Sequence, residues 1–103
     1  MSARIALDRD KIAEFCRRWR IAEFALFGSV LRNDFRPDSD VDVLVTFASD
    51  SHWTLFDMVH MRNELQKILG RKADLVSRRG IEASRNYLRR KAILSSAEVV
   101  HVA

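Results

Sequence analysis

Two short patterns in this chain combine residue types and a spacing that suit phosphate and metal chemistry. An apolar segment runs into Gly28-Ser29, and after ten further residues Asp40 and Asp42 alternate with valines. Gly-Ser lets a backbone turn sharply and approach a phosphate closely. Aspartates two residues apart on a strand project to one face, where they can hold Mg²⁺ while the valines pack in a core. Together the patterns indicate nucleotide chemistry.

Asp74 offers a third carboxylate to the same site. It lies within a run, Ala73 to Val76, that is otherwise apolar and that we expect to be a strand. A charge there is costly unless it is paired or coordinated, and it can face Asp40 and Asp42 if the two strands are neighbours. The alternative is a solvent-facing residue on an edge strand. Divalent cations would relieve the repulsion between the aspartates, and two ions roughly 4 Å apart would clamp the entering and leaving oxygens of a phosphoryl displacement.

The segment after the first apolar run has the features of a phosphate-binding turn. Gly28 permits the turn, and a following helical turn would present free N–H groups to an anion. The Ser29 hydroxyl can donate to a phosphate oxygen, and Arg32, one turn later, can offer a guanidinium to the terminal phosphates. A plain strand-ending turn with a surface arginine is the alternative, and the spacing to Asp40 argues against it.

The elements that position these residues follow from apolar periodicity and from capping and turn residues. We expect strands at residues 22–27, 40–47 and 72–77, with the first central and a further edge strand at 97–102. We expect helices from Asp8 or Asp10 to about Trp19, from Trp53 to Leu69, and within residues 81–96. The order predicts an α/β (α+β) fold with a small mixed sheet flanked by helices, in a single domain over residues 1–103.

Helix ends and core residues can also be assigned from the sequence. Ser51 is the expected N-cap of the helix beginning at Trp53, Gly70 its C-terminal stop, and Gly80 a further break. Trp53, at a junction of loop and helix near the acidic centre, is a candidate to line an adenine pocket or a partner surface. The residues expected in the core are Trp19, Phe24, Phe47, Leu55, Phe56, Met58, Val59, Leu65, Ile68, Leu69, Tyr87, Leu88, Ile93 and Leu94.

Charge and composition limit the class of protein. The net charge is +4, with an acidic centre between residues 33 and 57 and a basic segment between residues 62 and 91. That asymmetry suits a cation site facing a surface for anions, and equally a nucleic-acid surface or a solvated helix face. No apolar run is long enough for a membrane span, and a single cysteine, Cys16, fits a reducing cytosol, so we expect a cytoplasmic protein.

The motifs resemble those of a known superfamily. Gly28-Ser29, ten residues and Asp40-Val41-Asp42-Val43 resemble the signature of the DNA polymerase β-like nucleotidyltransferases. Further strings look like its minimal nucleotidyltransferase (MNT) branch, and the likeness runs from about Glu23 to the C-terminus. These strings are Gly-Ser-x-x-Arg, Ser39-Asp40-x-Asp42, Leu55-Phe56-Asp57, Leu69-Gly70-Arg71-Lys72-Ala73-Asp74-Leu75-Val76 and Tyr87-Leu88-Arg89.

The resemblance implies a polymerase β-like fold and a specific activity. MNT domains of this length are typically antitoxins of type VII pairs, which transfer AMP from ATP to a tyrosine of a HEPN toxin ribonuclease. By motif, Gly28, Ser29, Ser39 and Arg32 would contact the nucleotide. Asp40, Asp42 and Asp74 would be the catalytic, metal-binding carboxylates, with two Mg²⁺ ions and ATP as substrate. The chain is too short for an acceptor domain of its own, so a HEPN protein partner is expected to present the acceptor.

Two other functions remain open from the sequence. The chain could neutralise a toxin by stoichiometric binding alone, although three costly carboxylates argue for catalysis. It could also be a nucleic-acid-binding module that uses its basic segment, and such binding would weaken steeply with salt. The basic residues concerned are Arg78, Arg79, Arg85, Arg89, Arg90 and Lys91.

Overall fold

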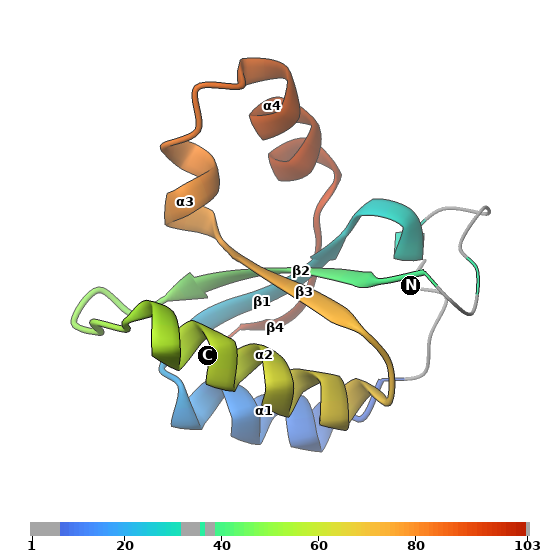
Figure 1. The fold of residues 1–103 in the computed structure, drawn as a ribbon, viewed down its shortest axis with the longest axis vertical. Helices are drawn as coiled ribbons and strands as arrows, with labels where there is room; N and C mark the ends of the chain where they lie inside the picture. The colour runs from blue at the N-terminus through green and yellow to red at the C-terminus, as the bar shows by residue number, and fades with distance from the viewer. Residues whose placement is uncertain (1–6, 32–35, 37–38, 103) are drawn as a thin grey trace.

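The structure is a computed structural model that describes residues 7–31, 36 and 39–102, with only the backbone of Ser29. Its elements along the chain are α1 (Arg9–Arg18), β1 (Ile21–Phe27), the 3₁₀ turn η1 (Gly28–Leu31), β2 (Val41–Phe47), α2 (Leu55–Leu69), β3 (Ala73–Ser77), α3 (Arg78–Glu82), α4 (Tyr87–Ser96) and β4 (Glu98–Val102). Figure 1 shows a sheet with α1 and α2 on one face and α3 and α4 on the other. No helix in the described ranges is both long and apolar enough to cross a membrane.

The four strands form one mixed sheet in the order β3-β2-β1-β4. β1 pairs antiparallel with β2 and with β4, whereas β2 and β3 run parallel. The predicted α/β (α+β) fold is therefore confirmed, with β1 inside the sheet and β4 at an edge. β3 forms the other edge.

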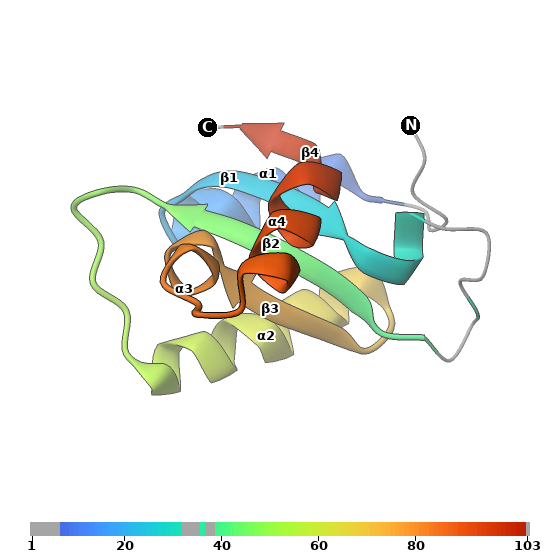
Figure 2. The same cartoon turned by 90° about the horizontal axis from the view of Figure 1, so that it is seen from above.

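Strand periodicity divides the sheet into two differently packed faces. Val41, Val43 and Val45 are fully buried against α1 and α2, because alternate residues of a strand point to one side. Their neighbours on the strand face α3 and α4, where Leu44 packs with Ile81 and Ile93 in a smaller cluster. Figure 2 shows α3 and α4 lying over β2 and its neighbours. Asp42 alternates with the buried valines, so it belongs to this second face.

The start of α2 differs from the prediction. Its N-cap is Thr54, whose hydroxyl accepts from the backbone N–H of Asp57 at 3.2 Å, while the Asp57 carboxylate accepts from the N–H of Thr54 at 2.9 Å. This reciprocal capping box satisfies two helix N–H groups that would otherwise lack partners. Ser51, the predicted cap, donates instead to the carbonyl of Ala48. Gly70 ends the helix in a left-handed conformation, as predicted.

Several predicted core residues lie on the surface. Phe56 is 81% exposed and Leu55 84%, and Val59 is also exposed, because α2 turns its Met58, Met61 and Leu65 stripe toward the sheet. At 3.6 residues per turn Phe56 then points away from that stripe.

The last two helices also differ from the prediction. Tyr87 and Leu88 in the first turn of α4 are exposed, whereas Ile93 and Leu94 pack on the sheet. Gly80 lies within α3, so it does not break the chain there. The hydroxyl of Ser77 caps that helix by accepting from the N–H of Gly80 at 3.0 Å.

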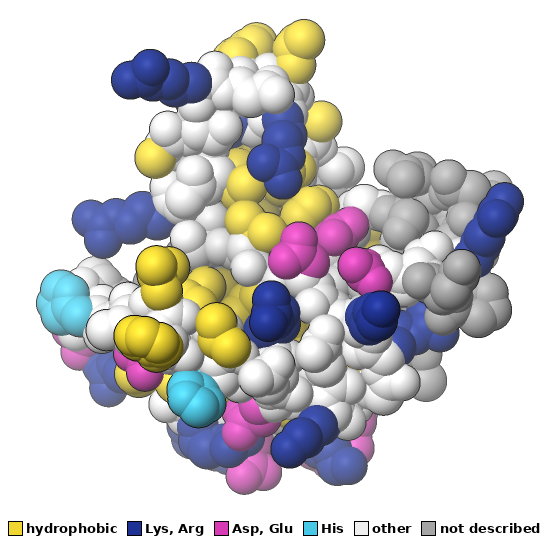
Figure 3. Space-filling view, viewed as in Figure 1, with side chains coloured by type: hydrophobic (Ala, Val, Ile, Leu, Met, Phe, Trp, Pro, Cys, Tyr) yellow, Lys and Arg dark blue, Asp and Glu magenta, His cyan; other side chains and the backbone are white. Residues whose placement is uncertain are grey.

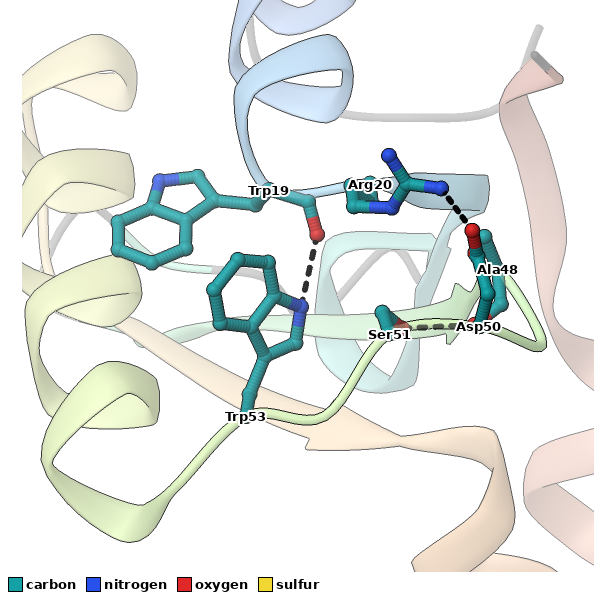
Figure 4. A network of polar contacts seen from close by, with 6 residues as sticks. All are labelled: Trp19, Arg20, Ala48, Asp50, Ser51 and Trp53. Carbon is teal, nitrogen blue, oxygen red and sulfur yellow. Dashed lines mark hydrogen bonds and ion pairs between the residues drawn. The ribbon is translucent and has the colours of Figure 1, made fainter.

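Trp53 helps to fix the loop between β2 and α2. Its indole N–H donates to the carbonyl of Trp19 at 2.9 Å, and the two rings meet edge to face at 5.1 Å between centroids (Figure 4). Asp50 of the same loop forms an ion pair with Arg20, which lies between α1 and β1, and the hydrogen bond that Arg20 donates holds the pKa of that carboxyl below its usual value. Trp53 is thus anchored by structural contacts.

Candidate active site

The turn after β1 brings Gly28 directly against the side chain of Asp42. Phe27 and Asp42 are register partners in the antiparallel β1–β2 pair, so the next residue turns back over the carboxylate. Gly28 has a φ of +77°, and a Cβ added to it would lie 2.4 Å from Oδ2 of Asp42. The backbone conformation favours glycine here, and any larger residue would also have to displace the Asp42 carboxylate. The predicted association of the glycine turn with the aspartate strand is therefore present in the fold.

Asp42 and Asp74 are also register partners, in the parallel β2–β3 pair. Neighbouring strands lie about 4.8 Å apart, so paired residues project side by side from the same face. Asp42 is half-buried, whereas Asp74 is exposed on the edge strand. The expectation that these two strands are neighbours is confirmed. Gly28, Asp42 and Asp74 form a line across the sheet, which we call the acidic row.

Asp40 lies just outside the strand. It is exposed and precedes Val41, whose N–H donates to the carbonyl of Lys72 at 3.0 Å. That bond places Asp40 at the end of the sheet where β2 and β3 begin. Figure 3 shows acidic side chains gathered in the middle of the view, where β2 and β3 lie in Figure 1.

The carboxylates fit Mg²⁺ by chemistry, since hard oxygen ligands on one face leave room for phosphate and water. As the side chains stand, no three His, Cys, Asp or Glu residues in the described part of the chain are grouped as a metal-ligand set. Asp40 and Asp74 are both exposed, so their rotamers are open to rearrangement on a ligand. The acidic row is a place where a cation and a triphosphate could bind together.

The other predicted site residues contribute in different degrees. Ser29 is within η1, on the turn that follows Gly28. Ser39 shapes its own loop, because its hydroxyl accepts from the N–H of Arg36 at 3.1 Å and its N–H donates back at 3.0 Å. Arg32 lies outside the described residues. Their roles toward a nucleotide therefore remain predictions.

A hollow at the opposite end of β2 and β3 was not foreseen from the sequence. It has a volume of about 620 Å³ and is lined by side chains from the ends of both strands and from the starts of α2 and α3. Trp53, Leu55 and Arg79 are among them. Trp53 and Leu55 are far from Arg79 in the sequence, and the parallel pairing of β2 and β3 places the starts of α2 and α3 beside one another.

Comparison with known proteins identifies the family. The sequence model of the nucleotidyltransferase domain matches residues 9–100, almost the whole chain. The chain belongs to this family. The resemblance inferred from the motifs is therefore confirmed, and the glycine turn and aspartate strand lie within the matched domain.

Two of the relatives that the chain matches are named as protein adenylyltransferases. A candidate protein adenylyltransferase of Methanocaldococcus jannaschii is 31% identical over 64 residues, which are 62% of this chain and 64% of the relative. The protein adenylyltransferase MntA of Thermococcus cleftensis is 31% identical over 70 residues, 68% of this chain and 69% of the relative. The chain thus spans about two thirds of the length of these relatives.

Solved structures agree on the fold. The structure of a candidate minimal nucleotidyltransferase is 33% identical, has a TM-score of 0.66, and is matched over 87% of this chain and 86% of its own. A complex of a tri-AMPylated HEPN toxin from Shewanella oneidensis with its MNT antitoxin gives a TM-score of 0.62 at 18% identity, over 92% of this chain and 70% of that one. At that identity the second match concerns the fold alone.

Proposed function

We propose that this chain is a Mg²⁺-dependent protein adenylyltransferase that transfers AMP from ATP to a tyrosine of a HEPN toxin, and so acts as its antitoxin in the cytoplasm. The observation that carries the proposal is the acidic row, in which Gly28 is packed on Asp42 and Asp42 is paired with Asp74. Membership of the nucleotidyltransferase family and relatives named as protein adenylyltransferases support it. The fold shared with an MNT antitoxin supports the partner.

The residues of the acidic row, together with Ser29 and Asp40, have distinct roles in this proposal. Gly28 and Ser29 would approach the phosphates, while Asp40, Asp42 and Asp74 would hold Mg²⁺, which would neutralise phosphate charge. Asp74, the most accessible of the strand carboxylates, accepts the proton of the tyrosine hydroxyl. The phenolic oxygen then bonds to the α-phosphorus, the bond from that phosphorus to its bridging oxygen breaks, and pyrophosphate leaves.

The test is a transfer assay with purified components. The chain is incubated with ATP labelled at the α-phosphate, Mg²⁺ and the purified product of the adjacent reading frame. We expect label on that partner, no label with EDTA, and a loss of about 10²–10⁴-fold in rate for Asp74→Asn. Asp42→Asn should be at least as severe, because its side chain is fixed between Gly28 and the neighbouring strand.

A matched control separates catalysis from loss of charge. Asp10 is an exposed carboxylate in the first turn of α1, on the other layer of the fold. Asp10→Asn should transfer AMP at the wild-type rate. If Asp42→Asn transfers as fast as this control, the acidic row is not the active site. If instead it neutralises the toxin at equal dose without transfer, the chain is a binding antitoxin.

A further inference from the structure

The first two turns of α2 expose a group of large apolar side chains. Leu55 and Phe56 are 84% and 81% exposed, and Val59 lies one turn later on the same side. Figure 3 shows hydrophobic side chains gathered over the start of α2. The Thr54–Asp57 capping box fixes this end of the helix. We call Leu55, Phe56 and Val59 the α2 apolar patch.

The patch adjoins the hollow at the ends of β2 and β3. Leu55 belongs to both, and Phe47, Trp53 and Met58 add further apolar wall. Contiguous apolar surface beside a depression is characteristic of a binding site for another macromolecule, because such surface is otherwise disfavoured in water. At about 620 Å³ the hollow can receive more than one side chain of a partner.

The charge around the hollow indicates what kind of partner fits. Arg78 is held between Glu23 and Glu82, at 3.7 and 3.6 Å. Arg79, which also lines the hollow, is exposed and has no ion-pair partner within the described ranges. An arginine beside an apolar pocket favours a carboxylate that can pair with its guanidinium.

We propose that the α2 apolar patch and the hollow dock an amphipathic helix of the partner protein, with apolar side chains in the hollow and an acidic side chain on Arg79. An exposed helix ridge such as Leu55–Val59 packs well into the groove of a second helix, and helix-in-groove binding anchors residues one turn apart. The assignment of this helix to the acceptor protein rests on the proposed function.

The position of the docking site suits transfer to a docked partner. The row pairs Asp42 with Asp74, and three residues later Val45 pairs with Ser77 beside the hollow. Three residues of strand span about 10 Å. β3 is an edge strand and Asp74 on it is exposed, so a helix seated in the hollow can bring a neighbouring part of its own protein to the acidic row. Figure 3 shows the acidic group and the hydrophobic group on one face of the molecule.

The experiment measures binding without chemistry. Affinity for the purified product of the adjacent reading frame is measured by calorimetry in the absence of ATP. Leu55→Ser/Phe56→Ser should weaken binding at least 30-fold, as expected for the central residues of an interface. Both side chains are exposed, so thermal unfolding of the variant should be unchanged. Arg79→Glu should weaken binding at least 10-fold, and more at low than at high salt.

Two exposed residues outside the hollow provide matched controls. Leu88 on α4 is 76% exposed and Arg85 lies in the preceding loop, and neither is among the residues that line the hollow. Leu88→Ser and Arg85→Glu should bind like the wild type. If these two weaken binding and the α2 variants do not, the partner docks on α4 and the proposal is wrong. Light scattering adds one outcome: a homodimer abolished by Phe56→Ser would make the patch a contact between copies and would also overturn it.

Docking and catalysis fail separately in this design. Asp42→Asn should bind the partner normally and transfer no AMP. A wild type that binds through α2 without transferring AMP refutes the proposed function and leaves the docking site standing. Transfer that persists at the wild-type KM in Leu55→Ser/Phe56→Ser refutes the docking site and leaves the proposed function standing.

Discussion

Replacing Gly28 with alanine tests the geometry of the acidic row most directly. Two separate effects act on the new methyl group. The φ of +77° is a left-handed conformation that costs an L-residue about 1–2 kcal/mol. In addition the methyl would lie 2.4 Å from Oδ2 of Asp42, which is closer than atoms in contact can lie, and 3.3 Å from Cγ, which is a tight contact. The carboxylate must therefore move, or the turn must open.

The two effects can be given separate magnitudes. Forcing extra volume into a packed site costs about 1–3 kcal/mol. With the backbone strain, Gly28→Ala should lower the free energy of unfolding by about 2–5 kcal/mol. For a domain of this size each kcal/mol corresponds to roughly 4–8 °C in Tm. Affinity for Mg²⁺·ATP should fall as well, because the displaced carboxylate is a proposed ligand of the metal.

Gly70→Ala provides the matched control. Gly70 has a φ of +71°, and nothing lies within 4 Å of a Cβ built on it. It therefore reports the backbone strain alone, about 1–2 kcal/mol. Urea unfolding of both variants gives the difference in the free energy of unfolding that is due to the clash. Calorimetric titration with Mg²⁺·ATP compares their affinities for the nucleotide. Gly70→Ala should bind nucleotide like the wild type.

A double-mutant cycle then identifies the group that clashes. Asp42→Ala removes Oδ2 and Cγ and leaves only Cβ, which lies at an ordinary contact distance of 3.6 Å from the added methyl. In that background Gly28→Ala should cost no more than Gly70→Ala, so the coupling energy should be about 1–3 kcal/mol. A Gly28→Ala protein as stable as Gly70→Ala, or a coupling near zero, would refute the packing of Gly28 on Asp42.

Three other experiments test the surrounding structure. Trp53→Phe removes the hydrogen bond to the carbonyl of Trp19 and should lower the free energy of unfolding in urea by about 1–2 kcal/mol. The affinity for ATP should not change, and a loss of that affinity would mean that Trp53 lines an adenine pocket. Burial raises the pKa of the Cys16 thiol to about 11. Iodoacetamide at pH 8 should therefore alkylate Cys16 far more slowly in the folded chain than in urea, and equal rates would contradict the burial. The pKa of Asp50 is lowered by Arg20, so this pair stabilises the fold above about pH 4 and loses that effect as the pH falls further. The stability difference between wild type and Asp50→Asn should therefore be small at pH 7, smaller in high salt and smaller still as the pH falls below about 4, and a difference that does not change with pH or salt would refute the electrostatic origin.

The elements nearest the acidic row could be predicted because their signals are local. Gly28 marks the end of β1, the alternation around Asp42 marks a half-buried strand, and Gly70 marks the end of α2. The α2 N-cap was misplaced because serine and threonine are both good caps. The acidic residue three positions after Thr54 is the feature that distinguishes it, since only that arrangement closes a capping box.

Pairing between distant segments could not be predicted in the same way. The sequence indicated that Asp74 belongs to a strand, but its register with Asp42 depends on how β3 joins the sheet after the crossover through α2. A shift of one residue would turn Asp74 to the other face, against α1 and α2. The burial of Ala73 against those helices opposes such a shift, because alternation then places Asp74 on the face of Asp42.

The apolar residues that were wrongly assigned to the core separate into two kinds. Periodicity alone treats Leu55 and Phe56 like Tyr87 and Leu88, because each pair opens a helix. Tyr87 has a neighbour of its own, since the guanidinium of Arg90 lies 5.5 Å from its ring centroid. Leu55 instead forms the wall of a hollow that also contains Arg79, within about 10 Å of the acidic row. Local sequence rules tend to fail at functional positions. Here the wrong assignment of Leu55 and Phe56 to the core has a functional explanation, because Leu55 lines the hollow.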